Sequence, residues 1–185
     1  MKADYSNMSD NELVVMLDGK KSLSEAAFTA LYDRYSKKVF AYIIKIIGDK
    51  EAAEDIFQET FLRFFQNVRS NFQGGCTMGF LITIARNLCL NFKRDKKSNV
   101  PIESYEYLFN EQPSQELEQQ ELVRMALDLL EFEYREPLVL FVYNGMKYED
   151  IAQICGISIG NARLRVHRAK EKIKNILTPY LKEFC

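Results

Sequence analysis

Several features that indicate an enzyme or a metalloprotein are missing from this chain of 185 residues. The chain has a single histidine, His167, and its four cysteines are spaced neither as metal ligands nor as a CxxC pair. Zinc sites and disulfide frameworks need such spacings, so neither is expected and no metal site is assigned. We also recognise no nucleotide-binding loop and no catalytic triad, so we expect no enzymatic activity, no cofactor and no small-molecule substrate.

Long apolar runs are missing as well. No stretch approaches the roughly 20 residues that a membrane-spanning helix needs. The first residues include Asp4, Asp10 and Glu12 and lack the basic region and apolar core of a secretory signal. We therefore expect a cytoplasmic protein. The length fits one large or two small domains.

An excess of positive charge is the third missing feature, because the net charge is −1. The charges are nevertheless grouped. Bases dominate residues 86–97 and 163–174, whereas glutamates without a base fill residues 103–121. Two basic segments in separate places indicate two contacts with one polyanion.

The apolar periodicity predicts an all-α fold. Ser9, with Glu12 three residues later, forms a capping-box pattern that opens a first short helix, closed at Asp18-Gly19. Further helices are expected over about 28–46, 50–68, 78–93, 117–130, 137–143 and 148–155, and from 159 onward. The apolar run 138–142 fits a buried strand as well as a buried helix.

Two breaks in the periodicity organise the chain. The first is the loop from Asn71 to Gly75, and the second is residues 98–115, which carry Pro101 and Pro113 and little periodicity. We expect an N-terminal helical bundle over 1–97, a flexible linker over 98–115 and a C-terminal four-helix domain over 116–185.

Residues 148–174 have the pattern of a DNA-binding helix-turn-helix. Gly156 supplies the positive φ of the turn, Ala152 is the small residue where the helices cross, and Ser158 caps the second helix. That cap leaves backbone amides ready for a phosphate. Candidate DNA contacts on the second helix are Ser158, Asn161, Arg163, Leu164, Arg165, Arg168 and Lys170. The alternative is a solvated helix whose bases only keep it soluble.

The segment Gly145–Lys170 closely resembles region 4 of bacterial extracytoplasmic-function (ECF) sigma factors, the element that binds the −35 promoter element. The segment Asp49–Phe61 resembles the part of region 2 that docks on the β′ clamp helices of RNA polymerase. The segments Ile84–Leu88 and Lys93–Lys97 resemble the part that opens and reads the −10 element. These segments follow one another in the family's order, which is more specific than any one match.

The resemblance implies an initiation factor that binds core RNA polymerase and directs it to specific promoters. Its implied partners are promoter DNA, the β′ clamp helices and the β flap of polymerase. An anti-sigma factor is a further implied partner, with retention of the protein at the inner membrane through that partner as one option.

The resemblance assigns the polymerase-binding face to the helix over 50–68. On this helix Glu51, Asp55 and Glu59 stand at i, i+4 spacing, where like charges destabilise by a few tenths of a kcal/mol per pair. A basic partner covering the ridge explains this spacing, and a solvated helix face is the alternative. The predicted polymerase-binding residues are Glu51, Asp55, Gln58 and Glu59.

Reading the −10 element requires bases that leave the stack, aromatic platforms and phosphate contacts. In the glycine loop Asn71, Phe72 and Gln73 are placed to form a pocket for such a base, although a buried loop anchor is an equal alternative for Phe72. The candidates for holding the DNA backbone are Arg86, Asn87, Lys93 and Arg94.

The sequence departs from the family pattern at several positions. Phe80 stands where tryptophan is common, Thr83 where a base is common, and Lys147 where a helix-capping residue is usual. Asn161 and Leu164 replace a common threonine and a small polar residue, and Leu164 either meets a thymine methyl group or packs on a neighbour. The promoter sequence therefore does not transfer from the family.

Two rival interpretations compete with the initiation factor. A dimeric ligand-responsive regulator with a C-terminal helix-turn-helix would need strands in a sensor domain, but the N-terminal half is helical in pattern. An adaptor that borrowed the fold would not need bases on both domains. Polymerase-dependent, sequence-specific initiation would support the initiation factor over both rivals. Tight operator binding as a dimer without polymerase would contradict it.

Overall fold

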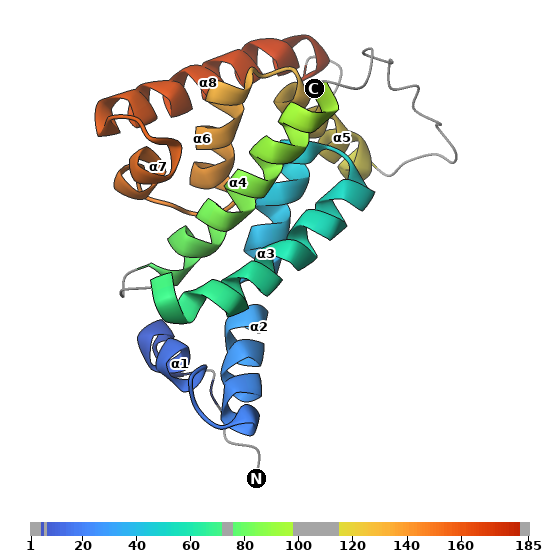
Figure 1. Cartoon of the computed structure of the whole chain (residues 1–185). Coiled ribbons are helices and arrows are strands. Elements are labelled where there is room, and N and C mark those ends of the chain that lie inside the picture. Colours follow the sequence, from blue (N-terminus) through green and yellow to red (C-terminus); the bar gives the residue numbers. More distant parts are fainter. Residues whose placement is uncertain (1–4, 6, 72–75, 98–114, 182–185) are drawn as a thin grey trace. The chain divides into compact units, whose positions relative to one another are not determined.

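The computed structural model describes residues 5, 7–71, 76–97 and 115–181, and across these ranges its regular elements are all helices. The predicted all-α fold is thus confirmed. The chain divides into two compact units, Met1–Leu90 and Asn91–Cys185 (Figure 1). The predicted boundaries at 97 and 115 stay predictions, since residues 98–114 lie outside the described ranges.

Four helices form the first part of the chain: α1 (Asp10–Met16), α2 (Lys21–Ile47), α3 (Lys50–Asn71) and α4 (Thr77–Lys97). The predicted capping box at the start of α1 is present. The backbone N–H of Ser9 donates to Glu12 at 2.8 Å, and the N–H of Glu12 donates to the Ser9 hydroxyl at 3.3 Å. The residues of α1 that point inward, with those of α2, α3 and α4, form an apolar core that includes Leu13, Leu31, Tyr42, Ile43, Phe64, Leu81 and Ile82.

The corner between α2 and α3 is tight. Gly48 ends α2 with a φ of +75° and donates its N–H to Ile44 at 2.9 Å. Only glycine adopts this left-handed conformation without steric cost. Asp49 then accepts the N–H of Ala52 at 3.1 Å and so caps α3. As a result α2 and α3 pack side by side as the main helix pair of the N-terminal unit.

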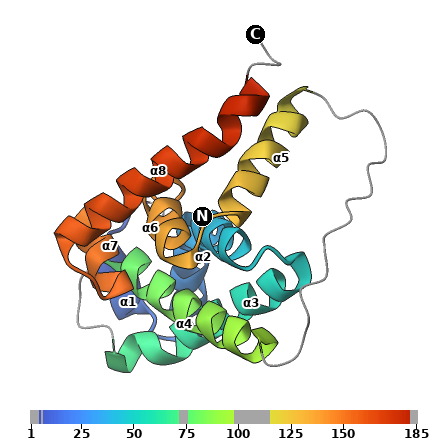
Figure 2. The same ribbon diagram turned by 90° about the horizontal axis from the view of Figure 1, so that it is seen from above.

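The C-terminal unit contains α5 (Gln115–Asp128), α6 (Phe132–Val142), α7 (Tyr148–Cys155) and α8 (Ile159–Leu181). The long α8 packs against the other three, and Figure 2 shows it running beside them. Buried residues where these helices meet include Ala126, Leu130, Val139, Leu140, Ile151, Ala162, Val166 and Ala169.

The helix α6 differs from the prediction, which began it at Pro137. It begins five residues earlier, at Phe132, and Pro137 lies inside it as a buried residue. Proline favours the first turn of a helix, and this preference suggested a start at Pro137. Here burial of the apolar run 138–140 compensates for the backbone hydrogen bond that proline cannot make. The same run, ambiguous in the sequence, is helical.

Candidate functional site

The turn of the helix-turn-helix has the predicted geometry. Gly156 has a φ of +68°, and the next N–H, that of Ile157, donates to the carbonyl of Ala152 at 3.0 Å. The Ser158 hydroxyl accepts the N–H of Asn161 at 3.2 Å, so Ser158 caps α8 as expected. Lys147 precedes α7 without a side-chain cap. These contacts fix the angle at which α8 leaves the turn.

Residues of α8 divide into a buried face and an outward face. Ala162, Val166 and Ala169 are buried, and Ile173 is half-buried, as the predicted packing face requires. The opposite side exposes Asn161, Leu164, His167 and Arg168. Leu164 is 42 % exposed, which favours a contact with another molecule over packing on a neighbour within the unit.

The flanks of α8 carry three of the predicted DNA contacts in pairs that the sequence did not indicate. Arg165 is half-buried, with Nη2 at 3.3 Å from a carboxylate oxygen of Glu133 on α6. Across the helix, the cations of two other candidates lie over aromatic rings. These are Arg163, 5.4 Å from the ring centre of Tyr148, and Lys170, 4.6 Å from that of Phe141. The expected outward face therefore holds Asn161 and Arg168, but Arg165 leans toward α6.

The residues predicted to contact the −10 element lie on α4, at the end of α3 and at positions 72 and 73 between these two helices. Arg86 and Lys93 stand seven residues apart, about two turns, as do Asn87 and Arg94, so all four share one side of α4. Arg86 and Lys93 are half-buried, whereas Asn87 and Arg94 are exposed, and Arg94 pairs with Asp95 at 3.5 Å. Phe72 and Gln73 lie outside the described residues, and Asn71 is the last residue of α3.

The two departures from the family on α4 have structural roles. The ring of Phe80 lies 6.1 Å from that of Phe64 and thus belongs to the packing between α3 and α4. The hydroxyl of Thr83 donates to the carbonyl of Gly79 at 2.8 Å, within its own helix. Neither position carries a basic side chain, so the first cation along α4 is Arg86.

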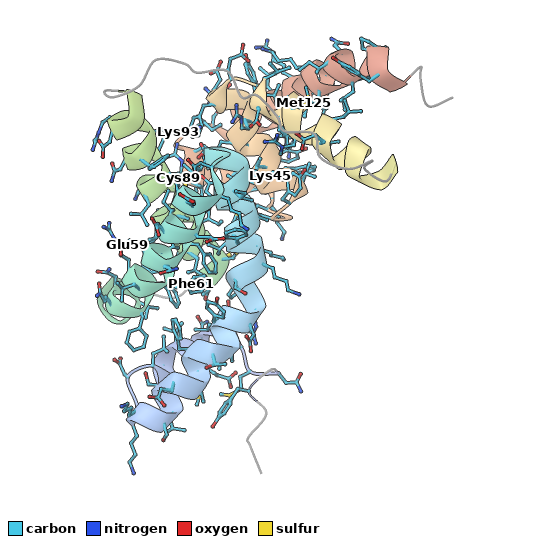
Figure 3. The ribbon with its side chains drawn as sticks, turned by 90° about the vertical axis from the view of Figure 1, so that its right-hand side faces the viewer. Lys45, Glu59, Phe61, Cys89, Lys93 and Met125 are labelled. Carbon is cyan, nitrogen blue, oxygen red and sulfur yellow. The ribbon has the colours of Figure 1, made fainter. Side chains whose placement is uncertain are left out.

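On α3 the predicted polymerase-binding residues lie on the surface but are not alike. Glu51, Asp55 and Gln58 are exposed, and no ion pair is present at Glu51 or Asp55 among the described residues. Glu59 differs, because its carboxylate lies 2.6 Å from Nε of Arg63 one turn later. Glu59 and Phe61 leave α3 on different sides (Figure 3).

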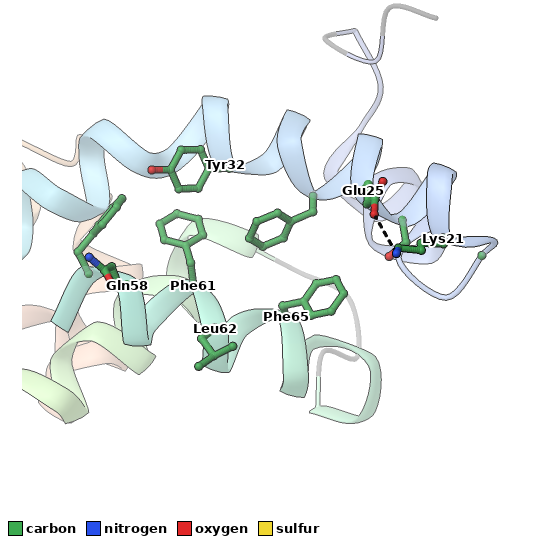
Figure 4. Close-up of a pocket in the computed structure, with 11 residues that line it drawn as sticks. Lys21, Glu25, Tyr32, Gln58, Phe61, Leu62 and Phe65 are labelled. Carbon is green, nitrogen blue, oxygen red and sulfur yellow. Dashed lines mark ion pairs between the residues drawn. The ribbon is translucent and has the colours of Figure 1, made fainter. Parts of the chain in front are cut away.

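A groove between α2 and α3 was not predicted from the sequence. Its volume is about 790 Å³. Figure 4 shows Tyr32 of α2 facing Phe61 of α3, with Phe65 further along and the Lys21–Glu25 ion pair, at 4.0 Å, at one end. The aromatic lining residues are Phe28, Tyr32, Phe57, Phe61 and Phe65, joined by Gln58 and Leu62.

These rings contact one another mostly edge to face. The ring centres of Phe28 and Phe65 are 5.4 Å apart with planes at 84°, and those of Tyr32 and Phe61 are 4.9 Å apart. Leu62, at the rim, is 52 % exposed. Gln58 belongs both to the groove and to the predicted polymerase face, so the two surfaces adjoin.

Two further features, a metal site and a membrane-spanning helix, are absent from the described ranges. No group of three or more His, Cys, Asp or Glu side chains there is arranged to hold a metal ion. No described helix is long and apolar enough to cross a membrane.

Comparison with protein families now defines the class. Residues 31–99 match the model of sigma-70 region 2, and residues 120–173 match that of sigma-70 region 4. The chain is 38 % identical over 141 residues to the ECF RNA polymerase sigma factor EcfG of Rhodopseudomonas palustris, covering 74 % of this chain and 77 % of that protein. It is 28 % identical to the ECF sigma factor SigM of Bacillus subtilis, over 78 % and 91 % of the two chains.

Solved structures agree with this class. The sigma factor RpoE from Bartonella quintana, determined with the anti-sigma factor NepR, is 27 % identical, with a TM-score of 0.69 over 82 % of this chain and 96 % of that one. CnrH, determined with the cytosolic domain of CnrY, is 19 % identical with a TM-score of 0.70 over 92 % and 97 %, and supports the fold.

Two sigma-70 regions in this order define a transcription initiation factor. More narrowly, the chain belongs to the ECF RNA polymerase sigma factors. Such a factor binds RNA polymerase and DNA, directs the polymerase to promoters through its region 2 and region 4 domains, and is not an enzyme. The rival interpretation as a ligand-responsive regulator is excluded, since the N-terminal half matches region 2.

Proposed function

We propose that the two units divide promoter recognition between them. The region 4 part, residues 120–173, reads the −35 element with α8, and the region 2 part, residues 31–99, opens and reads the −10 element with α4. The observation that carries this proposal is the capped start of α8, where Ser158 bonds Asn161 and the adjoining outward face exposes Arg168 and Leu164. Arginine and asparagine pair with guanine and adenine edges in the major groove, and an exposed leucine fits a thymine methyl group.

The −10 proposal is supported by the arrangement of α4. Three cationic side chains and the amide of Asn87 lie along one side of this helix, and side chains of these kinds contact phosphates. Arg86, Asn87, Lys93 and Arg94 would hold the backbone, while Asn71, Phe72 and Gln73 would receive an unstacked base. Replacing Asn87 with alanine should reduce opening of the −10 region, measured by permanganate reactivity, without reducing core binding.

For polymerase we propose that the β′ clamp helices dock on α3. Glu51, Asp55 and Gln58 are exposed there, and neither of the two carboxylates is paired in the described chain. The adjoining aromatic groove gives the same partner an apolar surface beside the acidic one. Glu59 contributes less charge, because Arg63 pairs with it.

The β flap is the proposed polymerase contact of the region 4 unit. Met125, near the end of α5, and Leu129, just after it, are 43 % and 68 % exposed, and exposed apolar side chains this close together favour a protein contact. Leu129→Glu should then weaken initiation at promoters that depend on the −35 element, while duplex DNA binding by the free protein stays unchanged. An unchanged rate of initiation would refute this contact.

An anti-sigma factor is the further proposed partner, and through it the protein would be held inactive, in the cytoplasm or at the inner membrane. One structural relative, the sigma factor RpoE from Bartonella quintana, was determined in complex with the anti-sigma factor NepR. The proposal requires a protein that displaces core polymerase from this chain in a competition experiment. A candidate that binds while polymerase remains bound is not the inhibitor.

The direct test uses purified chain, core RNA polymerase and a library of promoter fragments. Initiation that needs both protein and polymerase, at a subset of fragments sharing two spaced elements, is the expected result. Sequence-specific binding by the chain alone as a dimer, with no polymerase-dependent transcript, would contradict the proposed division of labour.

A further inference from the structure

Two carboxylates at the start of α6 face two bases on α8. Glu131, the residue before α6, accepts a hydrogen bond from Nζ of Lys172 at 2.7 Å. Glu133, in the first turn, lies 3.3 Å from Nη2 of Arg165. Arg165 and Lys172 stand seven residues apart, about two turns, so both pairs lie on one flank of α8.

Lys172 also lies 4.5 Å from the centre of the Tyr134 ring, so the opposite flank of α8 differs in that its two cations have rings, and no carboxylate, as partners in the described chain. Arg163 and Lys170 are also seven residues apart, and they lie over the rings of Tyr148 and Phe141, which stack at 5.1 Å. An aromatic ring attracts a cation through its quadrupole and leaves the net charge in place. The cations of this flank therefore still count toward binding a polyanion, whereas each carboxylate cancels the charge of its partner.

The backbone that carries the two glutamates is fixed. The half-buried guanidinium of Arg135 donates to the carbonyl of Asp128 at 2.5 Å and to that of Leu130 at 3.0 Å, across the corner between α5 and α6. The hydrogen bond from Lys172, and then a backbone bond at the helix start, hold the pKa of Glu131 below its ordinary value. Glu131 is thus negatively charged throughout the neutral range.

We propose that Glu131 and Glu133 are positioning residues that lower the affinity of α8 for DNA, because they compete with phosphates for Lys172 and Arg165. Their effect is to keep the free protein a weak DNA binder, so that the affinity of promoter recognition comes from the polymerase complex. The inference rests on the assignment of α8 to DNA, and its test separates the two.

The physical basis is counterion release. Each basic side chain that neutralises a phosphate releases a condensed cation. The logarithm of the binding constant therefore falls linearly with the logarithm of the salt concentration, by about 0.9 per phosphate contacted. A basic side chain that is already paired with a carboxylate gains less from a phosphate, because it must first leave its partner. Removal of the carboxylate should make that side chain available to bind DNA.

The test measures binding of the full chain to a short fluorescein-labelled duplex of mixed sequence, by anisotropy over a salt series. Glu131→Gln and Glu133→Gln should each tighten binding about two- to fivefold at low salt, the range expected for an exposed ion pair. The salt slope should steepen by about 0.9 for each base released. A change that only loosened α6 would alter thermal unfolding without steepening the slope.

Glu121→Gln is the matched control. It removes the same charge from the same unit, and Glu121 pairs with Arg124 of its own helix at 2.5 Å, not with α8. Glu121→Gln should leave the slope unchanged. Equal tightening in all three variants would reduce the effect to net charge and overturn the proposal.

A double-mutant cycle completes the test. Arg165→Ala should weaken binding more in the Glu133→Gln chain than in the original chain, and additive effects would overturn the proposal. Arg168→Ala, at an exposed base, reports on the proposed function itself. If Arg168→Ala and Arg165→Ala leave DNA binding unchanged in every background, α8 is not the DNA-binding helix. If only Glu131→Gln and Glu133→Gln leave DNA binding unchanged, the two glutamates do not limit it.

Discussion

Tyr35 of α2 donates the hydrogen bond of its phenol to the carboxylate of Asp10 on α1. Arg34 pairs with the same carboxylate and also donates to the carbonyl of Met8 at 2.8 Å. Burial, and then the bond to Asp10, raise the pKa of Tyr35 well above its ordinary value of 10.0. The short first helix is therefore tied to α2 by a bond that needs a protonated phenol.

Tyr35→Phe should loosen α1 selectively. Loss of one side-chain hydrogen bond destabilises by about 1 kcal/mol, and Arg34 still holds Asp10. Amide hydrogen exchange in α1 should quicken while α3 stays protected. Exchange that quickens equally in both helices would contradict this local role. Tyr180→Phe, at an exposed tyrosine of α8, is the control.

The same pair predicts an alkaline loss of stability. Because the folded pKa of Tyr35 lies above the unfolded value of 10.0, its contribution is complete below that pH and is lost as the pH rises toward the folded pKa. Urea unfolding of the original chain should therefore weaken more than that of Tyr35→Phe between pH 9 and about 11. An identical decline in the two chains would show that Tyr35 does not contribute.

The helix-turn-helix was predictable because its determinants are local. A glycine for the positive φ, an alanine at the crossing and a serine cap occur within seven residues, and the structure has all three as expected. The capping box of α1 is local in the same way. Such features depend only on residues close together in the chain, so they can be predicted from a single sequence.

Contacts between helices were not predictable in this way. Nothing local indicates that Arg165 pairs with Glu133, or that Phe28 meets Phe65 across the groove, because each pair depends on the packing of separate helices. The early start of α6 has a similar origin, since burial of its apolar run outweighs the preference of proline for a first turn.

Gly156 and Gly160 should respond to alanine with opposite signs. At Gly156 the φ of +68° disfavours any side chain, although a Cβ there meets no atom within 4 Å, so Gly156→Ala should destabilise the unit by about 1 kcal/mol. Gly160 lies within α8, where a Cβ meets only the Ser158 hydroxyl at 4.0 Å. Gly160→Ala should stabilise by about 0.5–1 kcal/mol. Chemical denaturation of the two variants checks both signs, and a stabilising Gly156→Ala would contradict the assigned turn.

Arg168→Ala should reduce promoter use more than Arg165→Ala. Arg168 is exposed on the outward face of α8, whereas Arg165 is half-buried and paired with Glu133. Loss of one base contact weakens recognition by about 1–3 kcal/mol, so the Arg168 variant should lose at least fivefold in initiation by the holoenzyme. Both variants should bind core polymerase normally. The reverse ranking would place Arg165 at the base edges instead.

Asp55→Lys should weaken polymerase binding and leave DNA binding by the free chain unchanged. The exposed carboxylate of Asp55 lies on the proposed docking face, and reversal of its charge opposes a basic partner. Asp33→Lys makes the same change at an exposed position of α2 that does not line the groove, and should bind normally.

Leu62→Asp then tests the apolar side of the docking surface, since Leu62 is 52 % exposed and its replacement leaves the core intact. The affinity for core polymerase, measured by competition with an unlabelled original chain, should fall in Asp55→Lys and Leu62→Asp alone. If all three variants bound alike, the docking surface would lie elsewhere than on α3.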